Sequence, residues 1–183
     1  MHWKMNYIKF FRPALIVIFL LAALTILPGF AEDTIDGPKY SADKRFIDNG
    51  DGTISDTKTG LMWMKDDSYQ HKKHWLNWFQ TKEYVADLNN EAFADYTNWQ
   101  VPTFKELLTL YEADKLNSSQ VGSEMKIHID PIFSKNGAGS HWAAETNGHY
   151  NAFGIVYNTG DRFNSARRNK SRKGVRAVRQ YFP

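Results

Sequence analysis

The chain has 183 residues, of which 23 are Lys or Arg and 20 are Asp or Glu, and it contains no cysteine. The lack of cysteine excludes disulfide bonds, a thiol nucleophile and thiolate metal sites. The near balance of charges indicates no particular class of partner. The length fits a single domain of about 150 residues preceded by a terminal segment.

The first 31 residues have the three parts of a secretory signal peptide. Three basic residues precede an apolar run over residues 14–27, and small residues at Gly29 and Ala31 predict cleavage after residue 31. The run is shorter than the roughly 20 residues that a membrane-spanning helix needs. We therefore predict export to the periplasm or the cell surface without membrane contact after cleavage; an uncleaved anchor is the alternative.

Residues 32–44 are polar and predict an extended leader, and residues 45–183 are expected to form the domain. Its first feature is a β-hairpin, because β-prone runs at 45–48 and 53–56 flank an Asn-Gly-Asp-Gly turn. A second turn then leads into the apolar run Leu61-Met62-Trp63-Met64.

Two helices are predicted from their capping signals. Asn77 and Gln80 form a capping box at the start of a helix expected over residues 77–89, and Thr103 and Glu106 repeat the pattern at the second helix. The apolar stripe of the first helix consists of Trp78, Thr81, Val85 and Leu88. The buried face of the second consists of Leu107, Leu110 and Tyr111, with Leu108 beside them.

The remaining segments predict loops and short strands. Residues 112–140 are mostly loop-like, and strands are expected over 141–145, 152–157 and 174–179 with a turn at 158–161. Strands at both ends with two helices between them indicate an α+β domain whose terminal strands meet in one sheet.

Asp48, Asp51 and Asp56 lie around a turn that is similar to an EF-hand loop. The first and last ligand positions of such a loop would be Ile47 and Lys58, which cannot act as its carboxylate ligands. We therefore expect a plain turn here, with a different kind of cation site as the alternative.

His71 and His74 have a spacing that would suit metal ligands on a helix, but Lys72 and Lys73 lie between them and repel a cation. We expect a solvated loop. The sequence also lacks a Gly-x-Ser-x-Gly elbow and both types of phosphate-binding loop. These observations predict a protein without catalytic activity, metal or other cofactor.

Charge is unevenly distributed along the chain. Residues 161–183 hold eight basic residues and one acidic residue, whereas residues 32–160 hold 12 basic and 19 acidic residues. Dense Arg and Lys suit sulfate, carboxylate or phosphate groups, and Arg offers bidentate contacts. The alternative is a solvated loop that balances the acidic remainder. The candidate anionic-ligand residues are Arg162, Arg167, Arg168, Lys170, Arg172 and Lys173.

Several motifs in order resemble the Lcl C-terminal-like domain family, a domain-of-unknown-function type named for the Legionella collagen-like adhesin. They are Arg45–Asp56, Thr59–Trp63, Trp78–Leu88, Asn98–Thr103 with Lys105–Leu107, His141–Ala144 and Gly174–Arg179. The resemblance implies a C-type-lectin-like fold, with a twisted antiparallel sheet, two flanking helices and a long loop region. It also implies a surface or periplasmic role, and the founding adhesin's domain is associated with sulfated glycosaminoglycans.

The resemblance gives some residues a structural meaning. Relatives carry cysteines where this chain has Val85 and Ala177, which implies apolar packing in place of a disulfide. Gln100 stands in place of the usual Arg, which removes a charge at that position. The matching residues Trp63, Trp99, Pro102, Trp142 and Arg179 are expected to build the core.

Three functional hypotheses follow. The first is an exported, non-catalytic binding or adhesion module for anionic glycans or an acidic surface, with no nucleic-acid partner. The second is a structural or accessory protein of the envelope that binds a protein partner and forms a homo-oligomer. The third is a hydrolase, which would need acid and base groups that converge in a cleft.

Overall fold

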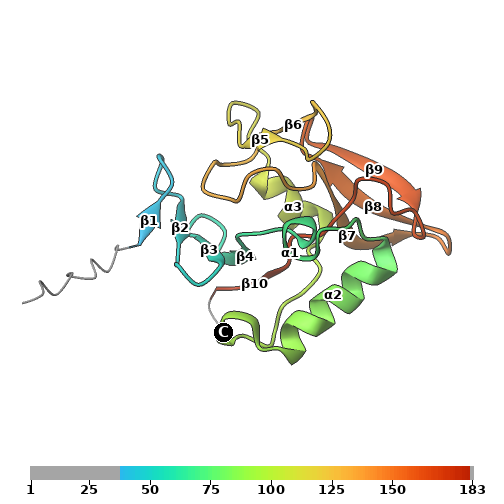
Figure 1. The fold of residues 1–183 in the computed structure, drawn as a ribbon, viewed down its shortest axis with the longest axis horizontal. Helices are drawn as coiled ribbons and strands as arrows, with labels where there is room; N and C mark the ends of the chain where they lie inside the picture. Colours follow the sequence, from blue (N-terminus) through green and yellow to red (C-terminus); the bar gives the residue numbers. More distant parts are fainter. Residues whose placement is uncertain (1–37, 182–183) are drawn as a thin grey trace, which may run out of the picture. The chain divides into compact units, whose positions relative to one another are not determined.

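A computed structural model of the protein describes residues 38–181 (Figure 1). The predicted signal peptide, residues 1–31, and residues 32–37 of the predicted leader lie outside the described residues. The described chain combines α-helices with three antiparallel sheets, in agreement with the predicted α+β class. Within residues 38–181, no helix is long and apolar enough to cross a membrane.

Strands from both ends of the domain meet in one antiparallel sheet, as predicted. Strand β10 pairs with β4, and Val178 lies opposite Trp63. The turn between β2 and β3 contains Gly50 and Gly52 with φ of 81° and 89°, which glycine adopts without steric cost, so the predicted hairpin is confirmed. The order across the sheet is β1 (Lys39–Tyr40), β2 (Phe46–Asp48), β3 (Thr53–Asp56), β4 (Leu61–Met64) and β10 (Val178–Gln180).

Strand β4 is buried on both faces. Leu61 and Trp63 belong to a core that includes side chains of helix α3, whereas Met62 and Met64 belong to a second core that includes side chains of helix α2. Successive strand residues point to opposite faces of a sheet, so an uninterrupted apolar run fills both cores.

Both predicted helices are present. They are α2 (Trp78–Asn90) and α3 (Phe104–Leu110). Asn77 and Thr103 are their N-caps, and each forms the predicted capping box. Leu107 and Leu110 are buried in α3, but Leu108 is 42% exposed, so its placement beside the buried face was wrong. Leu108 lies on the side of this short helix that faces solvent.

Besides β1, which lies in the predicted leader, four further short elements were not predicted. Helix α1 starts with a further capping box, in which Asp67 is the N-cap and Gln70 is its partner. The segment predicted to be mostly loop contains only two short paired strands, which agrees with that prediction. The elements are α1 (Ser68–Lys72), the 3-10 helix η1 (Phe93–Asp95), β5 (Ser118–Ser119) and β6 (Lys126–Ile127).

A separate three-stranded sheet follows in the chain. It consists of β7 (Ser140–Asn147), β8 (Asn151–Val156) and β9 (Asp161–Ala166). Strands β7 and β8 confirm two predicted strands, but β9 was not predicted. Strand β10 begins only at Val178, so the strand expected over 174–179 is shorter than predicted. The resemblance implied one twisted antiparallel sheet, whereas the described residues form three antiparallel sheets.

The two faces of this second sheet pack against different helices. Ile155 lies in the core that contains Leu107 of α3. On the other side, Trp142 and Ala152 pack with Trp78 from the first turn of α2. The sheet thus lies between α3 and the start of α2. This packing fixes the position of the end of β9, from which the following loop begins.

Most residues that carry the family resemblance build the cores, as expected. Trp63 and Trp142 are fully buried, and Trp99 is nearly so. Val85 and Ala177 lie in the same core, so apolar packing joins α2 to the segment before β10 at the two positions where the resemblance implied cysteines in relatives.

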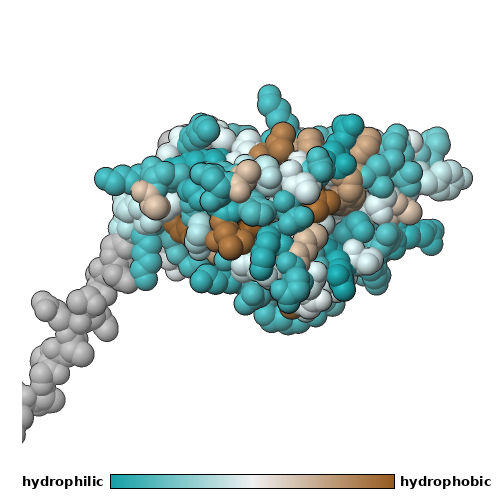
Figure 2. Space-filling view, turned by 90° about the horizontal axis from the view of Figure 1, so that it is seen from above, coloured by the Kyte–Doolittle hydropathy of each residue, from teal (hydrophilic) through white to brown (hydrophobic). Residues whose placement is uncertain are grey.

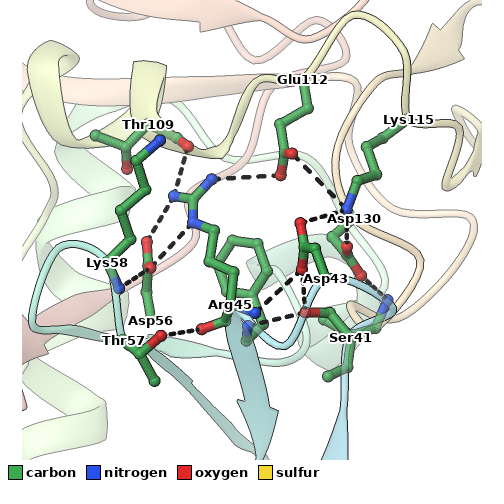
Figure 3. A network of polar contacts seen from close by, with 12 residues as sticks. Ser41, Asp43, Arg45, Asp56, Thr57, Lys58, Thr109, Glu112, Lys115 and Asp130 are labelled. Atoms are coloured by element: carbon green, nitrogen blue, oxygen red, sulfur yellow. Dashed lines mark hydrogen bonds and ion pairs between the residues drawn. The ribbon is translucent and has the colours of Figure 1, made fainter.

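Ion pairs join the N-terminal strands to the segment after α3 (Figure 3). Arg45 Nη2 lies 2.6 Å from Asp56 Oδ2, and Arg45 Nη1 lies 3.3 Å from Glu112 Oε1. Nearby, Lys115 Nζ lies 2.6 Å from Asp130 Oδ2. Asp56 is fully buried, so this network neutralises a charge inside the protein.

Candidate functional site

Residues 167–173, which we call the basic loop, lead from β9 toward β10. Both ends are fixed by backbone hydrogen bonds to the first residue of α2 and to the segment just before it. The Trp78 N–H donates to Arg167 O over 3.0 Å, and the Leu76 N–H donates to Lys173 O over 2.9 Å. The basic loop is therefore held in place by the folded domain, and its ordering cost on ligand binding is low.

Arg167 is fixed by further contacts. Its N–H donates to Tyr150 O in the β7–β8 turn over 2.9 Å. Its guanidinium carbon lies 5.3 Å from the ring centroid of Trp78 and 5.2 Å from that of Phe79. In Figure 1 the start of α2, the β7–β8 turn and the chain after β9 lie together at one side of the domain. Cations over aromatic faces are attracted to the ring electrons, so the side chain is held at the surface.

Lys173, at the end of the basic loop, contacts a second pair of aromatic rings. Its Nζ lies 5.6 Å from the ring centroid of Trp142 and 5.4 Å from that of Phe163. Burial lowers the pKa of Lys173. Lys82, one turn into α2, places its Nζ 4.0 Å from the Trp78 ring and adds a positive charge beside the loop.

Three cations project from the middle of the basic loop. Arg168, Lys170 and Arg172 are exposed, and no acidic side chain within residues 38–181 pairs with them. The loop backbone is supported from within, because the Ser171 N–H donates to Asn169 Oδ1 over 2.8 Å. This arrangement leaves three charges available to an anionic ligand.

Arg162 does not join the other five predicted site residues. It lies near the opposite end of β9, about 16 Å from Arg167 at a rise of roughly 3.3 Å per residue. Its guanidinium carbon lies 4.4 Å from the Phe153 ring centroid and 5.8 Å from that of Phe104. Arg162 and Phe163 are adjacent strand residues and point to opposite faces, so Arg162 faces the α3 side of the sheet.

The sequence analysis missed four residues beside the basic loop. Trp78 was predicted only as a core residue of α2, and Phe79, Lys82 and Tyr150 were not singled out. The spacing of Trp78 and Lys82 did carry a signal, because residues four apart on a helix lie on the same face. Nothing in the sequence placed Tyr150 next to Arg167.

A shallow groove of about 230 Å³ lies between α1 and α2. Leu76 belongs to its lining and also holds the end of the basic loop, so the two features are neighbours. Its lining also includes Glu83 and Asp87 of α2 together with Lys72 and His74. The two carboxylates repel an anionic chain, so we place the groove outside the candidate site.

The three aspartates of the EF-hand-like turn are occupied by protein donors. Asp48 Oδ2 accepts from Lys65 Nζ over 2.6 Å, and Asp51 Oδ1 accepts from Thr53 Oγ1 over 2.6 Å. Asp56 is paired with the arginine described above. Among the described residues, no group of three or more His, Asp or Glu side chains is placed to hold a metal ion.

The prediction of a solvated loop at the paired histidines was wrong for His71, which belongs to α1. Its Nδ1 lies 3.0 Å from the Tyr84 hydroxyl. His74 follows the helix, and its Nδ1 lies 3.0 Å from Lys72 O. The helix forms because its Asp67 cap satisfies the first backbone N–H groups.

A buried polar centre lies between α1 and β7. Asp67 Oδ2 accepts from the Ala138 N–H over 2.6 Å and lies 3.4 Å from His141 Nε2. Burial acts to raise the pKa of Asp67, but the hydrogen bond from His141 and the charge of Arg176 lower it overall. Burial lowers the pKa of His141, which favours the neutral ring, and a proton on Nε2 allows this ring to donate to Asp67. Because all three side chains are buried, we assign this centre to stability.

We expect the free energy of unfolding to decrease as the pH falls below about 6.5, partly through His141. The pKa of His141 is lower in the folded protein than in the unfolded chain, so between the two values only the unfolded chain binds the proton. One such proton changes the free energy of unfolding by about 1.4 kcal/mol per pH unit. His141→Gln keeps an N–H donor but does not titrate. The free energy of unfolding measured with urea should therefore change less with pH in this variant than in the unmodified protein. Equal changes with pH in the two proteins would contradict the assignment.

The comparison with protein families agrees with the residues that carry the resemblance. The family model described as the Lcl C-terminal domain matches residues 52–179. The matched region contains α1, α2, α3 and the basic loop, and it covers well over half of the chain. A search of curated proteins finds no match. The chain therefore belongs to the family of proteins with an Lcl C-terminal domain.

Proposed function

We propose that this protein is an exported, non-catalytic binding or adhesion module of C-type-lectin-like fold whose basic loop binds anionic polysaccharides, sulfated or acidic. The observation that carries the proposal is the set of exposed cations at Arg168, Lys170 and Arg172, which have no acidic partner within residues 38–181, on a loop fixed at both ends. The membership in the Lcl C-terminal domain family supports an adhesion-related role.

Charge and rigidity together favour such a ligand. Closely spaced like charges repel one another, and an anionic chain that runs along the basic loop removes this repulsion. Arg168 and Arg172 can each bind a sulfate or carboxylate group with two parallel hydrogen bonds. Because the charges are exposed, the attraction should weaken as salt is added.

The other two hypotheses have less support. A protein-binding accessory role predicts a broad apolar face, but on the face in Figure 2 apolar residues form small areas separated by hydrophilic ones. A hydrolase needs acid and base groups in an open cleft, and the polar centre at Asp67 and His141 is buried.

Removal of the three exposed charges should weaken binding strongly. We expect the variant R168A/K170A/R172N to raise the Kd for dextran sulfate and for polygalacturonate about tenfold or more at physiological salt, since each exposed pair contributes up to about 1 kcal/mol. Asparagine is chosen for Arg172 because the backbone φ there is 51°. Isothermal titration calorimetry at two salt concentrations measures both the Kd and its salt dependence.

The matched control is K58A/K105A/K135A, which removes three exposed lysines from other parts of the surface. It changes the net charge by the same amount, and we expect its Kd to stay within about twofold of the unmodified protein. An equal loss in both variants would mean that net charge alone drives binding. No binding of either polymer by the unmodified protein would refute the proposed function.

A further inference from the structure

Two residues next to the basic loop have exposed aromatic side chains. Tyr150 is 84% exposed and Phe79 is 41% exposed, whereas the rings of Trp78 and Trp142 beneath the loop are buried. Both residues contact Arg167, Phe79 through its ring and Tyr150 through its backbone carbonyl. The Arg167 guanidinium lies 5.2 Å from the Phe79 ring centroid, and the Arg167 N–H donates to Tyr150 O.

Single exposed apolar residues are common on protein surfaces and need no special explanation. Phe79 and Tyr150 are informative because of where they lie. The described residues include five large apolar side chains that are exposed, and two of them belong to residues that contact Arg167 of the candidate site. Phe79 is also held rigidly, because it belongs to the first turn of α2 and its ring packs edge to face on Trp78.

We propose that Phe79 and Tyr150 are stacking positions for sugar rings, so that the site selects anionic polysaccharides over polyanions without sugar rings. The inference rests on the proposed function and adds two specificity-determining residues to it. A pyranose ring has a face of C–H groups that packs on an aromatic ring, while its charged substituents extend to the side. Arg167 lies next to both residues and is placed to bind such a substituent.

A membrane surface fits the same features less well. Insertion into a lipid interface needs apolar side chains at the most prominent positions. The centre of the basic loop instead presents Arg168, Lys170 and Arg172, and no large apolar residue lies between them. The structure thus favours a water-soluble polymer that carries both negative charges and sugar rings.

The test compares two polymers that carry the same sulfate esters, one on sugar rings and one on a plain carbon chain. They are dextran sulfate and poly(vinyl sulfate). We expect F79S/Y150S to raise the Kd for dextran sulfate about tenfold, as two aromatic contacts of about 0.5–1.5 kcal/mol imply, and to change the Kd for poly(vinyl sulfate) less than twofold. The control L108S/L116S removes two exposed apolar side chains elsewhere and should change neither value.

The outcomes separate this inference from the proposed function. Binding of both polymers with no selective effect of F79S/Y150S overturns the stacking role and leaves the basic loop as a charge-only site. Binding of neither polymer by the unmodified protein overturns both. Binding to anionic phosphatidylglycerol vesicles and to oligothymidylate is measured in the same way. If F79S/Y150S weakens binding only to the vesicles or only to oligothymidylate, Phe79 and Tyr150 are not stacking positions for sugar rings. Thermal melting of each variant confirms that it is folded.

Discussion

Replacing Arg45 with methionine is expected to lower the free energy of unfolding by about 3–5 kcal/mol, because it leaves a buried carboxylate without its partner. Arg45 Nε and Nη2 bind the two oxygens of Asp56 over 3.0 and 2.6 Å, and Nη2 also donates to Thr109 O over 2.8 Å. Asp56 is fully buried, and Glu112 on the other side of Arg45 would lose the same partner (Figure 3).

Urea unfolding followed by circular dichroism measures this change. Lys58→Met is the matched control, because the Lys58 side chain is exposed and lies two residues from Asp56. We expect a change within about 0.5 kcal/mol for the control. A loss below about 1 kcal/mol for Arg45→Met would show that the buried pair contributes little more than an exposed one.

Asp67→Ala is expected to produce the second large loss, again about 3–5 kcal/mol. Asp67 Oδ1 accepts from the Tyr69 and Gln70 N–H groups over 2.8 and 3.0 Å, which caps α1, while Oδ2 accepts from the Ala138 N–H. The substitution leaves three backbone donors without acceptors. It also removes the negative charge that faces buried Arg176.

Hydrogen exchange distinguishes the loss of the backbone hydrogen bonds from the loss of the negative charge near Arg176. The amides of Tyr69, Gln70 and Ala138 should lose protection in Asp67→Ala even under conditions where the domain remains folded. Asp67→Asn keeps an oxygen for the cap but loses the charge, so its stability should lie between the other two proteins. Asp114→Ala, at an exposed acidic position, is the control. Unchanged protection at the three amides would argue against the role of Asp67 in α1.

Local signals predicted the main elements of the fold well. The capping boxes at Asn77 and Thr103 and the glycine turn after β2 depend on residues that are close in sequence, so they can be recognised without tertiary information. Asp67 and Gln70 gave the same capping signal for α1. It was overlooked because the helix has only five residues and is followed by an unpatterned, strongly basic segment.

Strand β9 was missed because its sequence lacks the usual apolar alternation. Phe163 is its one large apolar residue, and the rest of the strand is polar or small and mostly exposed. Its pairing with β8 supplies the structure that the pattern does not show. This strand also explains why Arg162 is separated from the basic loop, since it carries that residue to the α3 side of the sheet.

Of the candidate site, only the positive charge could be predicted from the sequence. The density of Arg and Lys over residues 167–173 identified the basic loop from sequence alone. The residues that support it, Leu76 and Trp78, are about 90 residues away in the chain and meet it only in the folded domain. The same applies to Phe79, so the aromatic surroundings of the loop required the structure.

The most direct test of the central claim is an NMR titration of the isotope-labelled protein with dextran sulfate. We expect the largest amide shifts within residues 167–173 and at Phe79 and Tyr150, and small shifts around Lys58, Lys105 and Lys135. This result would place the anionic ligand on the basic loop. Shifts that are largest around those three lysines, with the basic loop unchanged, would contradict it.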